Sequence, residues 1–312
     1  MARNKRIVVF FLTTLEGGFN PPFFCEMKLS LIPILLFLGM GVFGQQPDSL
    51  KIESVKKVVD FLAGDEMRGR ATGSEQEAQS ADFIADDFLK IKSCKVKHQY
   101  FTIELDSLNL SSQNVIGFIN NHKKKTILIS AHYDHLGMGG PLSLSKKSNE
   151  VHNGADDNAS GVALMLGLAR TLAKENASFN FVFVAYSGHE IGLFGSKYFS
   201  ENILKKHKSI ALSINLDMVG RLGEDRKIYY ECSSNLKTEI KSESELQLIK
   251  STKERIGVLD TKWLMKKGIP SITFTTGMHN DYHKASDDLE YINFKGICQI
   301  EELLKNWILS YP

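Results

Sequence analysis

The chain contains few cysteines and none of them are paired as CxxC. It has four in 312 residues, at Cys25, Cys94, Cys232 and Cys298. Cys25 falls in a stretch that we expect to be removed, so three remain, which allows at most one disulfide even in an oxidising compartment. The spacing also excludes a zinc site built from cysteines.

The chain also lacks a surplus of charge. Of 38 basic and 36 acidic residues, four and two respectively come before Gln45, which leaves 34 of each in the remainder. A balanced chain gives no electrostatic reason to expect nucleic acid or an anionic membrane as a partner.

The longest apolar run stands near the N-terminus. Residues 27–44 combine one lysine, an apolar core interrupted by Pro33, and small or apolar residues at Val42 and Gly44. This is the plan of a signal peptide, and the apolar core is too short for a comfortable membrane span. We expect cleavage after Gly44, which would give a secreted or periplasmic protein that is no longer attached to the membrane. We also expect that residues 1–26 result from a misassigned start and that the true start is Met27. An uncleaved N-terminal anchor is the alternative.

Residues 45–312 contain no linker, internal repeat or low-complexity segment. Their length suits a single domain with a sizeable core, and we expect a monomer.

Four apolar runs are each followed by polar side chains. The runs are residues 126–130, 181–185, 210–216 and 269–274. The side chains that follow them are, in the same order, His132 with Asp134, then His189 with Glu190, then Asp217, and last Tyr282 with His283. Buried parallel strands deliver polar groups in this way at their carboxyl ends, where open α/β sheets hold ligands. The four runs therefore predict one site at one edge of a sheet.

Helical patterns alternate with these runs and predict an α/β three-layer sandwich, in which a mixed, mostly parallel sheet is flanked by helices. The expected helices span residues 49–63, 159–172, 192–199, 245–256 and 294–309, and strands over 96–105 and 114–119 are expected to pair at one edge. The polar loop 137–153 is expected to form a wall of the substrate cleft.

The polar residues include a set suited to zinc. Zinc binds histidine nitrogen and carboxylate oxygen, and two zinc ions close together need a shared carboxylate. A lone histidine or aspartate at a strand end is more often hydrogen-bonded scaffold. Five together predict a metal site, and the candidates are His132, Asp157, Glu190, Asp217 and His283.

Five motifs make the chain recognisable. They are HYD at 132–134, GADDNASG at 154–161, GHEIGLFGS at 188–196, NLDMVGR at 215–221 and YHKASD at 282–287. Together and in this order they resemble the M28 family of secreted zinc peptidases, whose aminopeptidase members carry the corresponding segments.

The resemblance implies two zinc ions per chain. His132 and Asp217 would be terminal ligands of one, Glu190 and His283 those of the other, and Asp157 the bridge. The peptide bond after Asp157 would be cis.

The resemblance also implies roles for residues around the metals. Asp134 would orient His132, and Tyr282 would hydrogen-bond the oxygen of the tetrahedral intermediate. A packed aromatic is the alternative reading of Tyr282. Three further histidines, His135, His152 and His279, match no ligand position.

One position departs from the family. The family has two consecutive glutamates, the first a general base and the second a ligand, whereas this chain has His189 before Glu190. A neutral imidazole with a reference pKa near 6.5 could take the proton. We therefore expect a slow enzyme in which His189 is the catalytic base.

Three functions compete on this basis. The leading one is a secreted two-zinc exopeptidase that acts on N-terminal residues of peptides, although in the wider family that the chain resembles the same scaffold also serves carboxypeptidases and dipeptidases. The second is a metal-bearing peptide-binding homologue that has lost turnover. The third is a zinc acyltransferase of the glutaminyl-cyclase type, which works with one metal.

Overall fold

The computed structural model describes residues 49–312 except 106–107, 204–208, 238–239, 241–244 and 252–258. Its described strands form one sheet in the order β1-β2-β4-β3-β5-β8-β6-β7. The strands are β1 (Cys94–Leu105), β2 (Leu108–Ile119), β3 (Thr126–His132), β4 (Asn180–Tyr186), β5 (Ile210–Leu216), β6 (Lys227–Cys232), β7 (Gln247–Lys250) and β8 (Ser271–Thr275).

The centre of the sheet is parallel. Strands β4, β3, β5 and β8 are neighbours that run in the same direction, and they are the four apolar runs of the sequence. Every residue of β3, β4 and β8 is buried, as expected for strands covered on both faces. The expected pairing of β1 with β2 at one edge is also present, and it is antiparallel.

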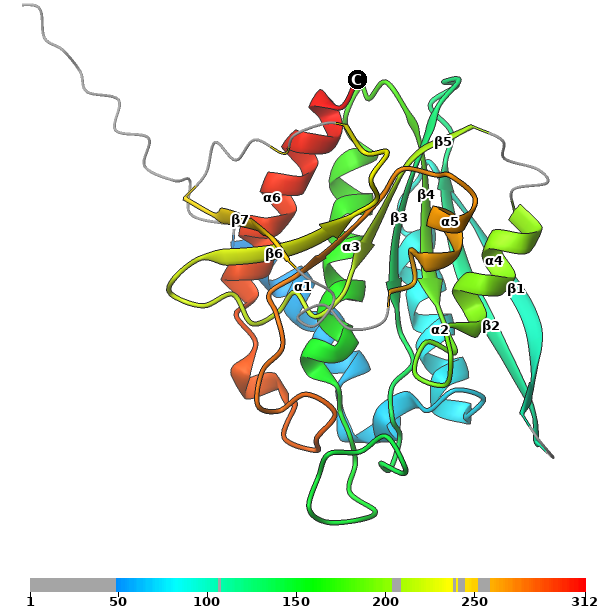
Figure 1. Cartoon of the computed structure of the whole chain (residues 1–312), viewed down its shortest axis with the longest axis vertical. Coiled ribbons are helices and arrows are strands. Elements are labelled where there is room, and N and C mark those ends of the chain that lie inside the picture. The colour runs from blue at the N-terminus through cyan, green and yellow to red at the C-terminus, as the bar shows by residue number, and fades with distance from the viewer. Residues whose placement is uncertain (1–48, 106–107, 204–208, 238–239, 241–244, 252–258) are drawn as a thin grey trace, which may run out of the picture. The chain divides into compact units, whose positions relative to one another are not determined.

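Helices cover both faces of the sheet (Figure 1). They are α1 (Ser49–Leu62), α2 (Glu75–Leu89), α3 (Gly161–Leu172), α4 (Phe194–Ile203), α5 (Lys262–Lys266) and α6 (Phe294–Ser310), with helical turns η1 (Asp65–Arg70), η2 (Ala155–Ser160) and η4 (Leu289–Tyr291).

The helices pack against the sheet in two separate apolar cores. The larger core joins the sheet to α1, α2, α3 and α6 through residues such as Val59, Phe88 and Leu166. The smaller core packs Phe199 of α4 and Leu264 of α5 against β3 and β4. The predicted α/β sandwich with a mixed sheet is therefore confirmed.

One expected helix is wrong. Within residues 245–256, Gln247–Lys250 form strand β7, which pairs in parallel with Lys227–Tyr230 of β6. Leu248 packs on the larger core, so pairing and burial outweigh a weak helical preference. Residues 252–256 lie outside the described part of the chain.

The expected signal peptide, residues 27–44, also lies outside the described residues, as do residues 1–26. Among the helices of the described part, none has the length and apolar character needed to cross a membrane.

Candidate metal centre

The candidate ligands meet at the carboxyl ends of the central strands. His132 is the last residue of β3, Asp217 directly follows β5, and Glu190 lies in the turn after β4. Asp157 comes from turn η2 and His283 from the segment after β8. Four of the five side chains are more than nine-tenths buried, and that of His283 is 12% exposed.

Asp157 lies between two pairs of these side chains. Its Oδ1 is 3.3 Å from His132 Nε2, which is itself 3.6 Å from Asp217 Oδ1. Its Oδ2 is 3.4 Å from His283 Nε2, which is 3.3 Å from Glu190 Oε2. The two oxygens of one carboxylate thus face two separate histidine and carboxylate pairs.

These separations fit zinc. Ligand atoms bound tetrahedrally at zinc distances of about 2.0–2.2 Å lie roughly 3.3–3.5 Å from one another. Among the described residues, the atom His132 Nε2 is buried and has no hydrogen-bond partner, as expected of a nitrogen that binds a metal. The residues present therefore fit bound zinc, with Asp157 facing both pairs.

Asp134 has partners other than the imidazole of His132. Its carboxylate accepts hydrogen bonds from the backbone N–H groups of His189 (3.1 Å) and Glu190 (3.3 Å) and from the hydroxyl of Thr72 (2.8 Å). His132 Nδ1 is 3.2 Å from the backbone oxygen of Asp134 and 3.8 Å from its carboxylate. The geometry thus supports Asp134 as a group that holds the segment carrying Glu190, while its carbonyl orients His132.

The other two terminal side chains also have fixed partners. His283 Nδ1 is 3.1 Å from the backbone oxygen of Leu142, in the loop 137–153 that we expected beside the cleft. Glu190 Oε1 is 2.9 Å from His135 Nδ1. Backbone and imidazole groups of this kind orient metal ligands and tune their basicity.

The remaining histidines have separate partners. His152 Nε2 is 2.7 Å from the hydroxyl of Ser143, and His279 Nε2 is 3.2 Å from Asp156 Oδ2. Both lie near the site without joining the two ligand pairs.

The turn that carries Asp157 is fixed by hydrogen bonds to Asp287 and Leu216. The peptide bond between Asp157 and Asn158 is cis, as the resemblance implied. Asp287 Oδ2 accepts hydrogen bonds from the backbone N–H groups of Asp156 (3.0 Å) and Asp157 (2.9 Å). Asn158 reaches the carbonyl of Leu216 at the end of β5 (3.0 Å).

Arg70 was missed by the sequence analysis. Its side chain is fully buried. The guanidinium donates to backbone carbonyls of five residues, Leu62, Tyr133, Asn153, Gly154 and Asp157. Burial lowers the pKa of Arg70 to about 10, against the opposing effect of Asp157 and Asp287, so the side chain stays charged at neutral pH. Arg70 therefore stabilises the turn that carries Asp157 and offsets part of the negative charge of the neighbouring carboxylates.

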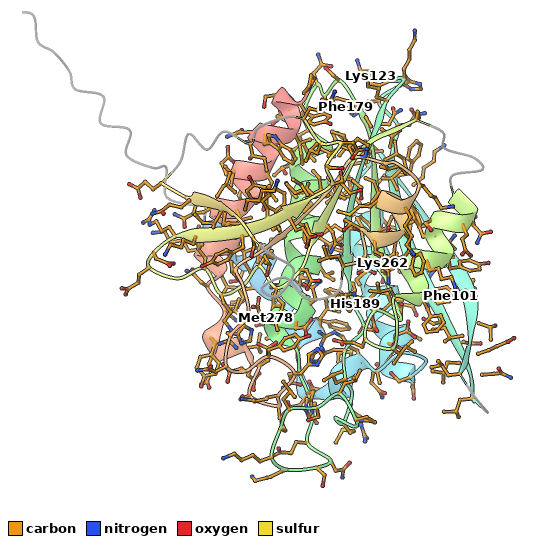
Figure 2. The ribbon with its side chains drawn as sticks, in the orientation of Figure 1. Phe101, Lys123, Phe179, His189, Lys262 and Met278 are labelled. Carbon is orange, nitrogen blue, oxygen red and sulfur yellow. The ribbon has the colours of Figure 1, made fainter. Side chains whose placement is uncertain are left out.

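His189, which is labelled in Figure 2, follows strand β4 and comes directly before the candidate ligand Glu190. Its ring stacks on that of His132 with centroids 3.7 Å apart and planes 8° from parallel. Its Nδ1 is 2.8 Å from Asp260 Oδ2, a contact that the sequence analysis did not foresee.

The stacking decides between two roles for His189. Ring nitrogens of His132 and His189 lie close enough to an oxygen of Asp217 to form a three-ligand group. A metal bound by imidazole lies in the ring plane along the nitrogen lone pair, and two parallel stacked planes cannot both contain the same ion. In this arrangement His189 is a neighbour of the metal centre rather than a ligand beside His132.

Tyr282 stacks on the candidate ligand His283, with ring centroids 3.9 Å apart. Burial raises the pKa of Tyr282, and the carboxylates of Asp157 and Glu190 raise it further. Its hydroxyl therefore keeps its proton at neutral pH and can donate a hydrogen bond.

The histidine ligands hold protons in the metal-free protein. Burial acts to lower the pKa of His283, but hydrogen bonds with Asp157 and Glu190 raise it to about 10. Burial opposes the same effect at His132, where Asp157 and Asp217 raise the pKa well above its usual range. Both imidazoles are therefore protonated at pH 7 and must lose a proton to bind zinc.

We expect zinc binding at pH 7 to release about two protons per chain. Because the pKa values are raised, zinc affinity should increase with pH through neutrality and level off toward pH 10. Titration calorimetry in buffers of different ionisation enthalpy measures the release. A binding heat that is the same in all buffers would show that the ligands are already deprotonated.

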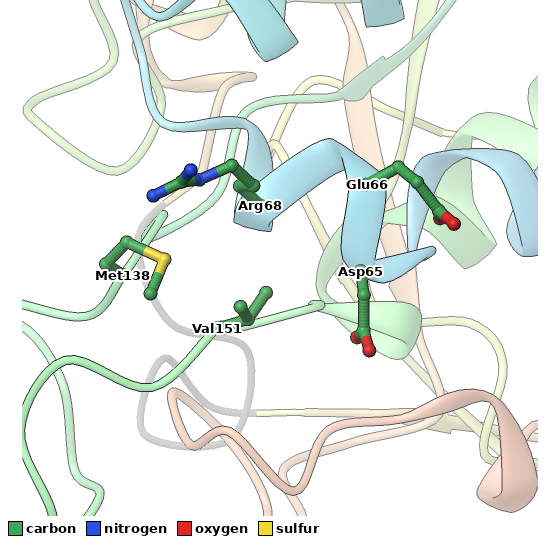
Figure 3. Close-up of a pocket in the computed structure, with 5 residues that line it drawn as sticks. All are labelled: Asp65, Glu66, Arg68, Met138 and Val151. Carbon is green, nitrogen blue, oxygen red and sulfur yellow. The ribbon is translucent and has the colours of Figure 1, made fainter.

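A surface hollow is formed by turn η1 and the loop 137–153 (Figure 3). It is lined by Asp65, Glu66 and Arg68 of η1 and by Met138 and Val151 of the loop. The five candidate ligands are not among its lining residues, so it is distinct from the metal centre.

Comparison with known families gives a match over most of the chain. The model described as peptidase family M28 matches residues 114–308. A protein named aminopeptidase YwaD from Bacillus subtilis (strain 168) is 26% identical over 272 residues. That alignment covers 81% of this chain and 53% of the relative, so the chain spans about half the length of that protein.

Solved structures share the fold. A zinc aminopeptidase from Bacillus subtilis has a TM-score of 0.64 at 18% identity, covering 82% of this chain and 94% of that chain. Fimbriiglobus ruber glutaminyl cyclase has a TM-score of 0.70 at 19% identity, covering 84% and 97%.

Proposed function

This chain belongs to peptidase family M28, and from that premise we propose that it is a two-zinc metallo-exopeptidase that removes N-terminal residues from peptides. The observation that carries the proposal is Asp157, whose two oxygens each face a histidine paired with a second carboxylate. An aminopeptidase relative covering 81% of the chain supports the choice of exopeptidase.

The chain's own residues would share the chemistry as follows. Bound zinc would polarise the scissile carbonyl and lower the pKa of a water molecule toward about 7. Tyr282, with its proton retained, would donate a hydrogen bond to the carbonyl oxygen as that oxygen gains charge. His189 would accept the proton of the attacking water at Nε2, because Nδ1 is engaged by Asp260.

The experiment that tests the function is hydrolysis of aminoacyl anilides by the zinc-reconstituted protein. We expect release of the anilide that stops on chelation and returns with zinc. N-blocked substrates serve as the control, since an aminopeptidase requires a free amine. Hydrolysis of the N-blocked anilides instead would indicate an endopeptidase.

Replacing His189 tests the base. His189→Ala is expected to lower kcat by about 10²- to 10⁴-fold, the usual contribution of a general base, without loss of zinc. His189→Glu restores the family's carboxylate and should raise kcat at least about tenfold. If the alanine variant were as fast as the natural protein, His189 would have no catalytic role.

The pH dependence follows from the same residue. Burial and His132 act to lower the pKa of His189, but Asp260 and Asp217 outweigh them and raise it to about 9 in the metal-free protein. This value is above the reference pKa of 6.5 for histidine. Two bound zinc ions would lower the pKa of His189, because their positive charge opposes protonation of the ring. Since protonated imidazole accepts no proton, kcat should fall toward acid pH from a midpoint no higher than about 9.

A peptide-binding homologue without turnover is the second candidate, and the observation that favours it is His189 in place of glutamate. It predicts zinc and peptide binding with no hydrolysis, even in the His189→Glu variant. The cyclase reading predicts one zinc per chain and cyclisation of N-terminal glutamine. Metal analysis with both substrates separates the three.

We also propose that the protein acts as a secreted or periplasmic monomer after removal of residues 1–44. N-terminal sequencing of the mature protein, which should begin at Gln45, and size-exclusion chromatography with light scattering test these two points.

A further inference from the structure

Asp260 is a buried acid that lies outside the five motifs by which the chain was recognised. Only 1% of its surface is exposed, and its Oδ2 is 2.8 Å from His189 Nδ1. It lies two residues before helix α5, on a segment separate from those that carry the candidate ligands. The hydroxyl of the next residue, Thr261, lies 3.3 Å from that of Thr273 in β8, so the carboxylate is placed by a packed element.

The contact between Asp260 and His189 fixes the tautomer of the imidazole. An ionised carboxylate can only accept hydrogen bonds, so the hydrogen between the two residues belongs to Nδ1 of His189. In the neutral ring the lone pair is then on Nε2. A ring nitrogen of His189 lies in the same group as ligand atoms of His132 and Asp217, within 4.8 Å of each. With Nδ1 engaged by Asp260, Nε2 is the nitrogen left to accept a proton.

The orientation of the ring is constrained from three directions. The backbone N–H of His189 donates to Asp134 Oδ1, the ring face lies on His132, and the ring edge lies against Asp260. Asp260 is the one of these three that selects which nitrogen carries hydrogen.

We propose that Asp260 is a positioning residue that acts only through His189, by holding the hydrogen on Nδ1 and leaving Nε2 as the proton-accepting atom. The proposal rests on the proposed function for its kinetic consequence, whereas the form of the imidazole can be measured without turnover.

The kinetic test is a double-mutant cycle in the zinc-loaded protein. Asparagine is nearly isosteric with aspartate but can donate to Nδ1 and so favour the wrong ring form. Asp260→Asn is expected to lower kcat by about 10²- to 10⁴-fold with a much smaller change in KM. In the His189→Ala background the same change should cause no further loss, so that the double variant is no slower than His189→Ala alone.

A second kinetic test uses the His189→Glu background, in which the effect of Asp260→Asn on kcat should be reversed. In the His189→Glu background, Asp260 would place a second carboxylate against the new glutamate, and like charges at short range oppose ionisation. Asp260→Asn should therefore raise kcat there, although it lowers kcat in the natural protein. A purely structural role for Asp260 predicts a loss in every background.

The independent measurement is a long-range proton–nitrogen NMR spectrum of the zinc-loaded protein, with the His189 signal assigned by its absence from His189→Ala. We expect hydrogen on Nδ1 in the natural protein and on Nε2, or a mixture, in Asp260→Asn. Asp87→Asn is the matched control, because Asp87 is a buried carboxylate paired with Arg170 away from the site. It should leave both kcat and the His189 signal unchanged.

The outcomes are decisive in either direction. An unchanged ring form in Asp260→Asn, or equal losses of kcat with and without His189, overturns the proposal. A protein with no peptidase activity but with the expected change of ring form would refute the proposed function and retain the role of Asp260.

Discussion

Asp157→Ala is expected to empty both zinc positions and to abolish peptidase activity. The two carboxylate oxygens of Asp157 lie 3.3 Å from His132 Nε2 and 3.4 Å from His283 Nε2, so the substitution removes a ligand from each pair. The histidines would then have one carboxylate each within the cluster. We expect kcat to fall at least about 10³-fold, since both zinc functions depend on complete coordination. Elemental analysis after zinc reconstitution gives the metal count.

Asp217→Ala is the comparison variant. Asp217 lies 3.6 Å from His132 Nε2, in only one of the two pairs. It should mainly weaken one zinc position and leave the other filled. Equal metal loss in the two variants would argue against Asp157 as the bridge.

Arg70→Met is expected to cause the largest loss of stability. The substitution removes donors from carbonyls at Leu62, Tyr133, Asn153 and Gly154, in a place that water does not reach. A buried polar group left without a partner costs about 1–3 kcal/mol, and several are affected, so we expect at least about 3 kcal/mol. For a chain of this size that lowers Tm by roughly 6–12 °C.

Arg68→Met is the matched control. Arg68 belongs to the same turn η1 but its side chain is exposed, so the same substitution there should change stability by no more than about 0.5 kcal/mol. Arg70→Lys keeps the charge with fewer donors and should fall between the two. Thermal unfolding of the zinc-free proteins measures all three. Similar Tm values for Arg70→Met and Arg68→Met would show that the hydrogen bonds of Arg70 do not stabilise the ligand turn.

The sequence predicts the parts of this site that follow strand order. His132 and Asp217 stand at the ends of apolar runs, and runs of this kind become buried parallel strands whose ends meet. The resemblance to family M28 carried the assignment further, and both the family and the sandwich are confirmed.

The supporting residues could not be predicted in this way. Arg70 reaches Tyr133 and Gly154, and Asp260 reaches His189, across 63, 84 and 71 positions of sequence. Neither has a periodic pattern or a motif that marks its partner, because these contacts arise only when the turns are packed together. The strand β7 was missed for a related reason, since its backbone pairs with β6 rather than following its own helical preference.

A zinc titration of aminoacyl-anilide hydrolysis, starting from the metal-free protein, tests the two-zinc peptidase most directly. Because Asp157 joins two ligand pairs, activity should rise with added zinc and reach its plateau at two equivalents per chain. A plateau at one equivalent, or no hydrolysis at any zinc concentration, would contradict it.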